Sequence, residues 1–122
     1  MNLDSKIMIT GANGMVGRSL VKKLKKEGYN NLLTPSSKEL DLKNQNDVEK
    51  YFKENKPNYV FHLAAKVGGI AANIESPADF LHDNLIMQSN VIEFARKYKV
   101  EKLLFLGSSC NYHKNTQQPM KE

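Results

Sequence analysis

Short apolar runs alternate with helical patterns along the whole chain. The apolar runs are Lys6–Thr10, Leu32–Thr34, Tyr59–Ala64 and Lys102–Gly107. Their length and nearly unbroken apolar character predict strands of a parallel sheet that is covered on both faces. The order β-α-β-α-β-α-β therefore predicts an α/β fold with a Rossmann-type, doubly wound parallel sheet. Right-handed crossovers favour the strand order 3-2-1-4, counted along the chain, in an incomplete sheet of about four strands.

Three segments between these strands carry helix signals. Met15–Glu27 has apolar residues at helical spacing, and Gly28 stands where a helix is expected to end. The next helix is expected to have Asn46 as its N-cap, because Glu49 follows three residues later. The third begins with Ser76-Pro77-Ala78-Asp79, which combines a cap, a first-turn proline and an acid, and it runs to about Tyr98.

Composition narrows the class of protein. The 122 residues allow one domain at most, and the net charge is +5. Much of the positive charge comes from four lysines (22, 23, 25 and 26) that fit the outer face of the first helix. No aromatic residues are interleaved with them to stack on bases, so we expect no nucleic-acid binding. A single cysteine, no secretory pattern and no long apolar run predict a cytoplasmic protein without disulfides or membrane spans.

A glycine-rich turn joins the first strand to the first helix. It reads Gly11-Ala12-Asn13-Gly14-Met15-Val16-Gly17. Gly11 permits a tight turn, Gly14 lets the backbone approach a pyrophosphate, and Gly17 lets helix and strand pack closely. The N–H groups at the helix start would bind the phosphates. The alternative is a plain turn with chance glycines, but the strand–turn–helix context favours a dinucleotide site that includes Asn13, Met15 and Val16.

The end of the second strand bears on the choice of cofactor. It reads Thr34-Pro35-Ser36-Ser37-Lys38, and no acid occurs before Glu39. The Ser37 hydroxyl and Lys38 ammonium suit the 2′-phosphate of NADP better than the free ribose of NAD, although NAD remains an alternative. Asp41 and Leu42 either line the adenine pocket or belong to the loop before the next helix.

Further candidates follow the third and fourth strands. Ligands of doubly wound sheets bind beyond the carboxyl ends of the strands, which is where Ala64, Ala65 and Lys66 lie in one loop. Gly68 and Gly69 would let the same loop approach a cofactor or substrate. Asn84 lies on the apolar stripe of its helix, and it is expected to bond a helix partner rather than that loop. The three histidines lack metal-ligand spacing, His62 is expected to be a satisfied residue near a strand end, and no metal is expected.

Several longer strings carry a family likeness. The glycine turn, His62-Leu63-Ala64-Ala65-Lys66-Val67-Gly68-Gly69-Ile70, Asn73 and Gly107-Ser108-Ser109-Cys110-x-Tyr112 occur in this order. Together they closely resemble the N-terminal part of the GDP-L-fucose synthase family of extended short-chain dehydrogenase/reductases. The likeness covers the whole chain but only about a third of a typical member. Residues 1–122 would thus be the N-terminal part of the NAD(P)-binding domain, without the rest of that domain or the substrate domain.

The resemblance implies a reaction. Members of the family convert GDP-4-keto-6-deoxy-D-mannose to GDP-L-fucose by epimerisation at two carbons and reduction with NADPH, usually as homodimers. By the same resemblance, Cys110 is an acid/base group of the epimerisation and Ser108 bonds the reacting carbonyl, while Val67, Gly68, Gly69 and Ser109 lie against the nucleotide-sugar. From the residues alone, Cys110 is also consistent with a buried thiol, and the two serines with loop hydroxyls.

The chain departs from the family pattern at three places. Asn13 and Ser37 stand where members often have basic residues that hold the 2′-phosphate, and His113 stands where a proline is common. The superfamily's proton donor is a tyrosine followed four residues later by a lysine. Only Tyr98 and Lys102 have that spacing, at a helix-to-strand junction, and we interpret it as coincidence.

Two functions follow from these observations. The chain is either the N-terminal part of an NADP-dependent nucleotide-sugar epimerase-reductase, inactive alone, or a stand-alone dinucleotide-binding module without catalysis. The apolar fourth strand has no following strand to pair with, so we also expect association of the chain through that open sheet edge.

Overall fold

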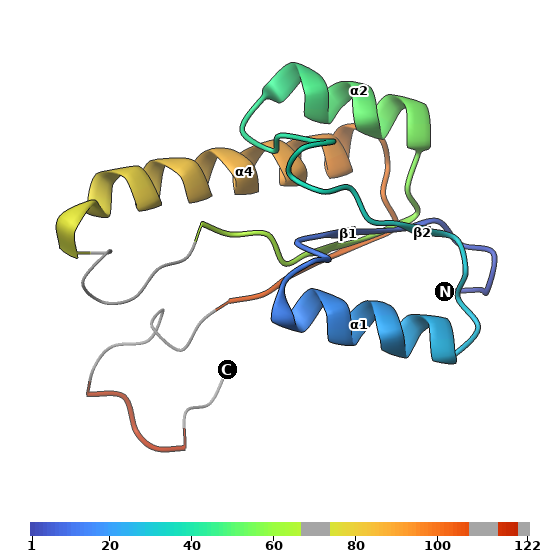
Figure 1. Ribbon diagram of the computed structural model, residues 1–122, viewed down its shortest axis with the longest axis horizontal. Coiled ribbons are helices and arrows are strands. Elements are labelled where there is room, and N and C mark those ends of the chain that lie inside the picture. The colour runs from blue at the N-terminus through green and yellow to red at the C-terminus, as the bar shows by residue number, and fades with distance from the viewer. Residues whose placement is uncertain (67–73, 108–114, 120–122) are drawn as a thin grey trace.

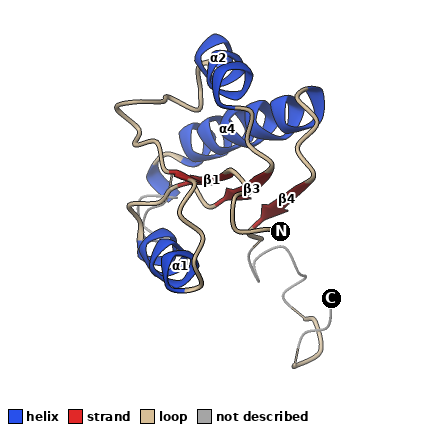
Figure 2. Cartoon of the chain, turned by 90° about the vertical axis from the view of Figure 1, so that its right-hand side faces the viewer, coloured by secondary structure: helices blue, strands red, loops and turns tan. Residues whose placement is uncertain are grey.

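The computed structural model describes residues 1–66, 74–107 and 115–119. In chain order its elements are β1 (Ile7–Thr10), α1 (Met15–Lys26), β2 (Leu32–Leu33), α2 (Gln45–Asn55), β3 (Tyr59–His62), α4 (Pro77–Lys97) and β4 (Lys102–Phe105). The strands form one parallel sheet, with α1 on one face and α2 and α4 on the other (Figures 1 and 2). This arrangement confirms the predicted α/β class with a parallel sheet.

The predicted strand order was wrong. The observed order is β2-β1-β3-β4, so β3 pairs with β1, with Ile7 opposite Tyr59, and does not continue beyond β2. The cause is the face that each helix covers. A right-handed crossover over one face moves in one direction across the sheet, and a crossover over the other face moves in the opposite direction. Because α2 packs on the face opposite α1, the chain returns past β1 before it forms β3.

Side chains of β1 alternate between two cores. Ile7 and Ile9 pack with Leu24 of α1, whereas Met8 packs with the side chains of α2 and α4. The larger core contains nine buried residues: Met8, Leu40, Leu42, Val48, Phe52, Val60, Val91, Phe94 and Ala95. Two of them, Leu40 and Leu42, come from the chain between β2 and α2, so this connection is anchored in the core. Both faces of β1 are therefore covered, as the continuous apolar run predicts.

The helix ends follow the predicted signals with one correction. Gly28 follows the C-cap residue Glu27 with a φ of 94°, and Pro77 is the first residue of α4 after Ser76. The N-cap of α2 is Asn44 and not Asn46, because the Asn44 Oδ1 accepts from the Asp47 N–H at 3.2 Å. Asn46 instead lies in the first helical turn. Both residues suit a cap, and the turn that ends at Asn44 decides between them.

The β4 edge of the described sheet is exposed. Leu104 and Phe105 are each 43% exposed and Leu106 is 47% exposed, whereas Leu103 packs against the larger core. Within the described residues, none of the helices has both the length and the apolar character that a membrane crossing requires.

Candidate functional site

Two glycines of the turn lie too close to neighbouring backbone to carry a side chain. Gly11 has a φ of 71°, and a Cβ there would lie 2.8 Å from the Ala64 nitrogen. A Cβ on Gly17 would lie 2.1 Å from the Gly11 carbonyl oxygen and 2.6 Å from the Ala12 Cα. Gly14 has more room, since the nearest atom is 3.3 Å away. The turn therefore needs glycine at 11 and 17 for packing, while Gly14 lies on the exposed surface beside the helix start.

The first turn of α1 directs N–H groups toward that open surface. Gly14 is the N-cap, and the first helical bond runs from the Arg18 N–H to the Gly14 carbonyl at 2.9 Å. The N–H groups of residues 15–17 precede this bond, and no acidic side chain lies in the first turn. Met15 and Val16 are exposed there. Such a helix end attracts anions, phosphates in particular.

Sequence reasoning missed Arg18. Its Nε donates to the Asn13 carbonyl at 2.8 Å, which places an exposed guanidinium beside the glycine turn. Its position directly after Gly17 was the available signal. Although Asn13 itself is uncharged, the turn therefore carries a cation.

The loop after β3 lies directly against the glycine turn. The Thr10 Oγ1 accepts hydrogen bonds from the N–H groups of Leu63 and Ala64, each at 3.2 Å. The same oxygen is hydrogen-bonded to His62 Nδ1 at 2.8 Å. His62 is 2% exposed, as expected for a satisfied residue at a strand end. Desolvation lowers the pKa of His62 to about 4, so its ring is neutral at pH 7. Ala64 is half-buried and Ala65 is exposed.

The segment after β2 forms a compact turn. The Glu39 N–H donates to the Ser36 Oγ at 3.3 Å, and the Ser36 N–H donates to the Glu39 carboxylate at 3.4 Å. The first acid after β2 is thus bonded back into its own turn. Ser37 and Lys38 lie exposed between these two residues.

Asp41 and Leu42 belong to a second turn that leads into α2. The Asp41 carboxylate accepts from the Lys43 N–H at 3.0 Å, and its carbonyl accepts from the Asn44 N–H at 3.0 Å. The Leu42 side chain is buried in the larger core, so the exposed part of this pair is Asp41. Asn90 of α4, another residue that sequence reasoning missed, donates to the Leu42 carbonyl at 2.8 Å.

Asn84 fixes the backbone of the loop after β3. Its Oδ1 accepts from the Lys66 N–H at 2.7 Å, and its Nδ2 donates to the Lys66 carbonyl at 3.0 Å. Of the two partners considered for Asn84, the structure shows the loop and not the favoured helix, because Asn84 faces a loop backbone that offers both a donor and an acceptor. The Lys66 ammonium pairs with Asp83 at 3.0 Å and lies 5.3 Å from the centre of the Phe80 ring. Its hydrogen bond lowers the pKa of Asp83.

Several predicted site residues lie outside the described residues. These are Val67, Gly68, Gly69, Ser108, Ser109 and Cys110. Tyr98 and Lys102 are described, and their roles are unrelated to a catalytic pair. Tyr98 is the C-cap residue of α4 and donates to Glu49 at 3.0 Å, whereas Lys102 begins β4. Tyr98 precedes β4 and Lys102 is its first residue, and β4 is parallel to the other strands, so both lie at the opposite end of the strands from the glycine turn.

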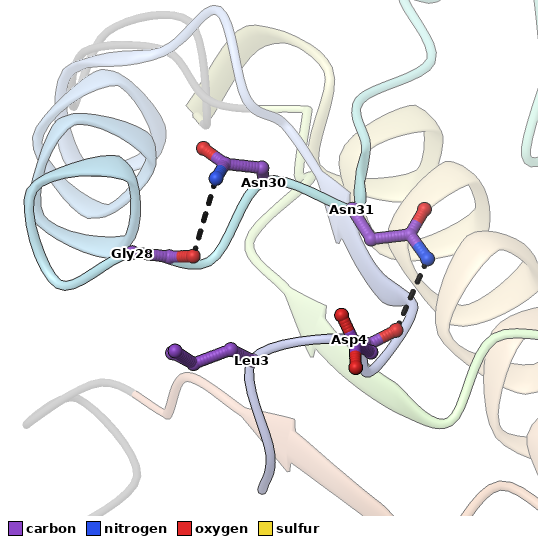
Figure 3. Close-up of a pocket in the computed structure, with 5 residues that line it drawn as sticks. All are labelled: Leu3, Asp4, Gly28, Asn30 and Asn31. Carbon is purple, nitrogen blue, oxygen red and sulfur yellow. Dashed lines mark hydrogen bonds between the residues drawn. The ribbon is translucent and has the colours of Figure 1, made fainter.

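Two surface cavities lie away from the glycine turn. One of about 470 Å³ is lined by Leu3, Asp4, Gly28, Asn30 and Asn31. It lies at the amino ends of β1 and β2, the opposite end of these strands from the turn. The Asn30 side-chain amide donates to the Gly28 carbonyl and the Asn31 amide donates to the Asp4 carbonyl (Figure 3). The other, of about 420 Å³, lies between the start of α2 and α4, beside Lys43 and His82. We therefore base the candidate site on the carboxyl ends of β1, β2 and β3.

Comparison with known proteins identifies the family of the chain. Residues 7–122 match the model of the NAD dependent epimerase/dehydratase family. The chain is 51% identical to GDP-L-fucose synthase 1 of Arabidopsis thaliana over 98% of its own length and 37% of the relative's. It is 44% identical to GDP-L-colitose synthase of Yersinia pseudotuberculosis over 96% of the chain and 38% of the relative.

A solved structure shows the same fold with a cofactor present. It is a GDP-mannoheptose C4 reductase from Campylobacter jejuni with NADP bound, at a TM-score of 0.94 and 46% identity. The match covers 99% of this chain and 38% of that one, so the chain spans little more than a third of the length of these relatives. The family match, the parallel sheet and the glycine turn agree, and the chain belongs to the NAD dependent epimerase/dehydratase family.

Proposed function

We propose that this chain is the NADP-binding, N-terminal part of a GDP-sugar epimerase-reductase of the GDP-L-fucose synthase type. The observation that carries the proposal is the glycine turn. Gly11 and Gly17 have no room for a side chain, and the exposed Gly14 is the N-cap that precedes the first N–H groups of α1. This arrangement fits the pyrophosphate of a dinucleotide. The names of the relatives supply the substrate class, a GDP-sugar.

The segment after β2 supports NADP over NAD. Glu39, the first acid after β2, is held in its own turn by a hydrogen bond from the Ser36 N–H at 3.4 Å, so we do not assign it to a ribose 2′-hydroxyl. The exposed Ser37 hydroxyl and Lys38 ammonium would instead hold a 2′-phosphate, with Arg18 as a further cation near the turn. Asp41 would lie against the adenine, and Ala64, Ala65 and Lys66 would line the other side of the cofactor.

For the chemistry we assign two residues. NADPH would supply the hydride that reduces the sugar ketone. The Ser108 hydroxyl would donate a hydrogen bond to the keto oxygen and stabilise negative charge there. The Cys110 thiol would move a proton at the carbon beside the ketone, while Val67, Gly68, Gly69 and Ser109 would contact the GDP-sugar. The Tyr-x-x-x-Lys spacing of the superfamily's proton donor occurs here only at Tyr98 and Lys102, at the junction of α4 and β4, so we assign no proton donor for the reduction to this chain.

The test is titration of the chain with NADPH and with NADH, followed by nicotinamide fluorescence. We expect binding of both, with NADPH tighter. Gly14→Ala keeps a permitted backbone but adds a methyl group to the phosphate surface, so it should raise the Kd by about tenfold or more. Lys38→Ala should weaken NADPH binding and leave NADH binding unchanged. Equal affinities of wild type and Gly14→Ala for both cofactors would refute the proposed site.

A second function, a binding module without chemistry, makes a different prediction. The C-terminal two thirds of a GDP-L-fucose synthase, supplied as a separate polypeptide, should restore NADPH oxidation with GDP-4-keto-6-deoxymannose if the chain is an enzyme part. A Cys110→Ser variant of the same mixture should then lose epimerisation. A binding module would bind NADPH equally well and would show no turnover in either mixture.

A further inference from the structure

Three residues form one row across the sheet directly below the candidate site. Thr10 of β1 is the register partner of His62 in β3, and His62 is the register partner of Phe105 in β4. The His62 ring stacks on the Phe105 ring with centroids 5.6 Å apart. Thr10 is 1% exposed and His62 is 2% exposed. The row thus places a buried imidazole between the glycine turn and the edge strand.

The hydrogen bonds of the row fix the position of the His62 proton. A hydroxyl group has one proton and two lone pairs. The Thr10 Oγ1 accepts from two backbone N–H groups, which can only donate. These two bonds leave the hydroxyl proton for His62 Nδ1, 2.8 Å away, and favour the acceptor role for this nitrogen. In that arrangement His62 is neutral and carries its proton on Nε2.

The Ala64 N–H depends on the Thr10 hydroxyl more than the Leu63 N–H does. The Leu63 N–H donates both to Thr10 Oγ1 and to the Thr10 carbonyl, each at 3.2 Å. The Ala64 N–H donates to the hydroxyl at 3.2 Å. The same Ala64 nitrogen lies against Gly11, where a Cβ would approach it to 2.8 Å. Ala64 is thus the point at which the loop after β3 meets the glycine turn.

We propose that His62 is a positioning residue of the cofactor site, which acts as a fixed acceptor for Thr10 and thereby holds the Ala64 N–H and its loop against the glycine turn. Because His62 Nδ1 accepts a hydrogen bond from the Thr10 hydroxyl, both lone pairs of the hydroxyl oxygen are directed toward the loop. This role rests on the proposed cofactor site. It makes no use of His62 as a catalytic group.

Two substitutions separate the acceptor from the ring. His62→Asn offers an amide oxygen close to the position of Nδ1 but has no ring, whereas His62→Phe keeps a ring that can stack on Phe105 but has no acceptor. Amide hydrogen exchange, read by NMR, compares Ala64 with Leu63 in each variant. Long-range proton–nitrogen spectra of the wild-type imidazole show which ring nitrogen carries the proton. NADPH titration then gives the effect on the Kd.

We expect wild-type Nδ1 to be unprotonated. In His62→Phe the Ala64 amide should exchange about tenfold faster, with a smaller change at Leu63, and the Kd for NADPH should rise by about tenfold. His62→Asn should stay near wild type in both measurements. A protonated Nδ1, unchanged Ala64 exchange in His62→Phe, or equal defects in both variants would each overturn the inference.

Two further measurements keep the outcomes distinct. If His62→Phe does not fold, Thr10→Ser and Thr10→Val replace it. Thr10→Val should speed the exchange of the Ala64 amide and shift the His62 Nδ1 resonance. Thr10→Ser keeps the hydroxyl and should change neither. If the wild-type chain binds neither NADPH nor NADH, the proposed function fails. The exchange and imidazole spectra still decide whether His62 positions Ala64.

Discussion

Gly17 shows how one residue can limit the packing of a helix against a sheet. It lies in the first turn of α1, where its Cα faces the backbone of Gly11 and Ala12. Backbone atoms cannot rotate away as a flexible side chain can. A methyl group at this position therefore forces α1 away from β1, whereas the same change at Gly14 makes one tight contact, 3.3 Å from the Gly11 carbonyl oxygen.

This difference predicts unequal costs for two similar substitutions. Gly17→Ala should lower the free energy of unfolding by about 3 kcal/mol, because the added Cβ overlaps backbone. Gly14→Ala should cost about 1 kcal/mol, since Gly14 is an N-cap residue with a φ of −75° that alanine also adopts. Urea unfolding followed by circular dichroism measures both. Equal midpoints for wild type and Gly17→Ala would show that α1 can move without loss.

Some of the site could be predicted at this scale and some could not. The glycine turn is contiguous, so its spacing and its place between a strand and a helix were visible in the sequence. The partnership of Thr10 and His62 spans 52 positions and depends on the register between β1 and β3. Asn90 and Leu42 are likewise 48 positions apart. Such contacts depend on the three-dimensional arrangement of elements, which no local pattern contains.

Among the elements, α2 and α4 are joined by a small polar cluster. The Glu49 carboxylate of α2 accepts from the Lys97 ammonium of α4 and, at 3.0 Å, from the Tyr98 hydroxyl. The hydrogen bond from Lys97 lowers the pKa of Glu49, and Tyr98 lowers it further. The folded state therefore favours the carboxylate form of Glu49. This contribution is complete above the pKa of Glu49 in the unfolded chain and is lost as the pH falls through the lower, folded value.

The cluster gives a prediction about acid stability. Glu49→Gln should lower the urea midpoint at pH 7 and show a smaller further decrease between pH 7 and about pH 3 than the wild type. Glu54→Gln is the matched control on the same helix, because Glu54 makes only an exposed contact with Lys50 at 4.0 Å. If Glu49→Gln and wild type lose stability in parallel on acidification, the cluster does not stabilise the pairing of α2 and α4.

Element existence was easier to predict than element ends. In the part of the chain that the structure describes, each helix and strand named above lies within or near its expected segment, because apolar periodicity reports burial directly. The first and last residues of a helix depend on which of several neighbouring side chains caps it. Asn44 and Asn46 are both good caps, and the turn from Asp41 to Asn44 selects the first.

At the scale of the whole molecule, handedness alone did not determine the strand order. Both possible orders use right-handed crossovers, and they differ in which face α2 covers. The apolar side of α2 shows that the helix packs on the sheet but not on which face. The connection that buries Leu40 and Leu42 leads the chain to the face opposite α1, and the strand order follows from that choice.

The exposed β4 edge leads to a prediction about association. The chain should form concentration-dependent oligomers in sedimentation or light-scattering measurements, because Leu104, Phe105 and Leu106 remain open to solvent. Leu104→Lys should shift the distribution toward monomer. Leu81→Lys, on an exposed part of α4, is the control and should leave association unchanged.

If Leu81→Lys shifts the distribution toward monomer and Leu104→Lys does not, the exposed face of α4 and not the β4 edge is responsible for association. A chain that stays monomeric at every concentration, with a sharp and high melting transition, would contradict the prediction as a whole.

The turn from Ser36 to Glu39 has a consequence for how coenzyme preference can change. It follows a two-residue edge strand, and the bonds of its Ser36 and Glu39 side chains stay within the turn. The residues assigned to chemistry follow β4 in the sequence, and β4 is at the other end of the strand order from β2. Exchange of this short segment should therefore convert the chain between phosphorylated and unphosphorylated coenzymes as an independent module. In a lineage or a design experiment, coenzyme choice and sugar chemistry are then free to diverge separately.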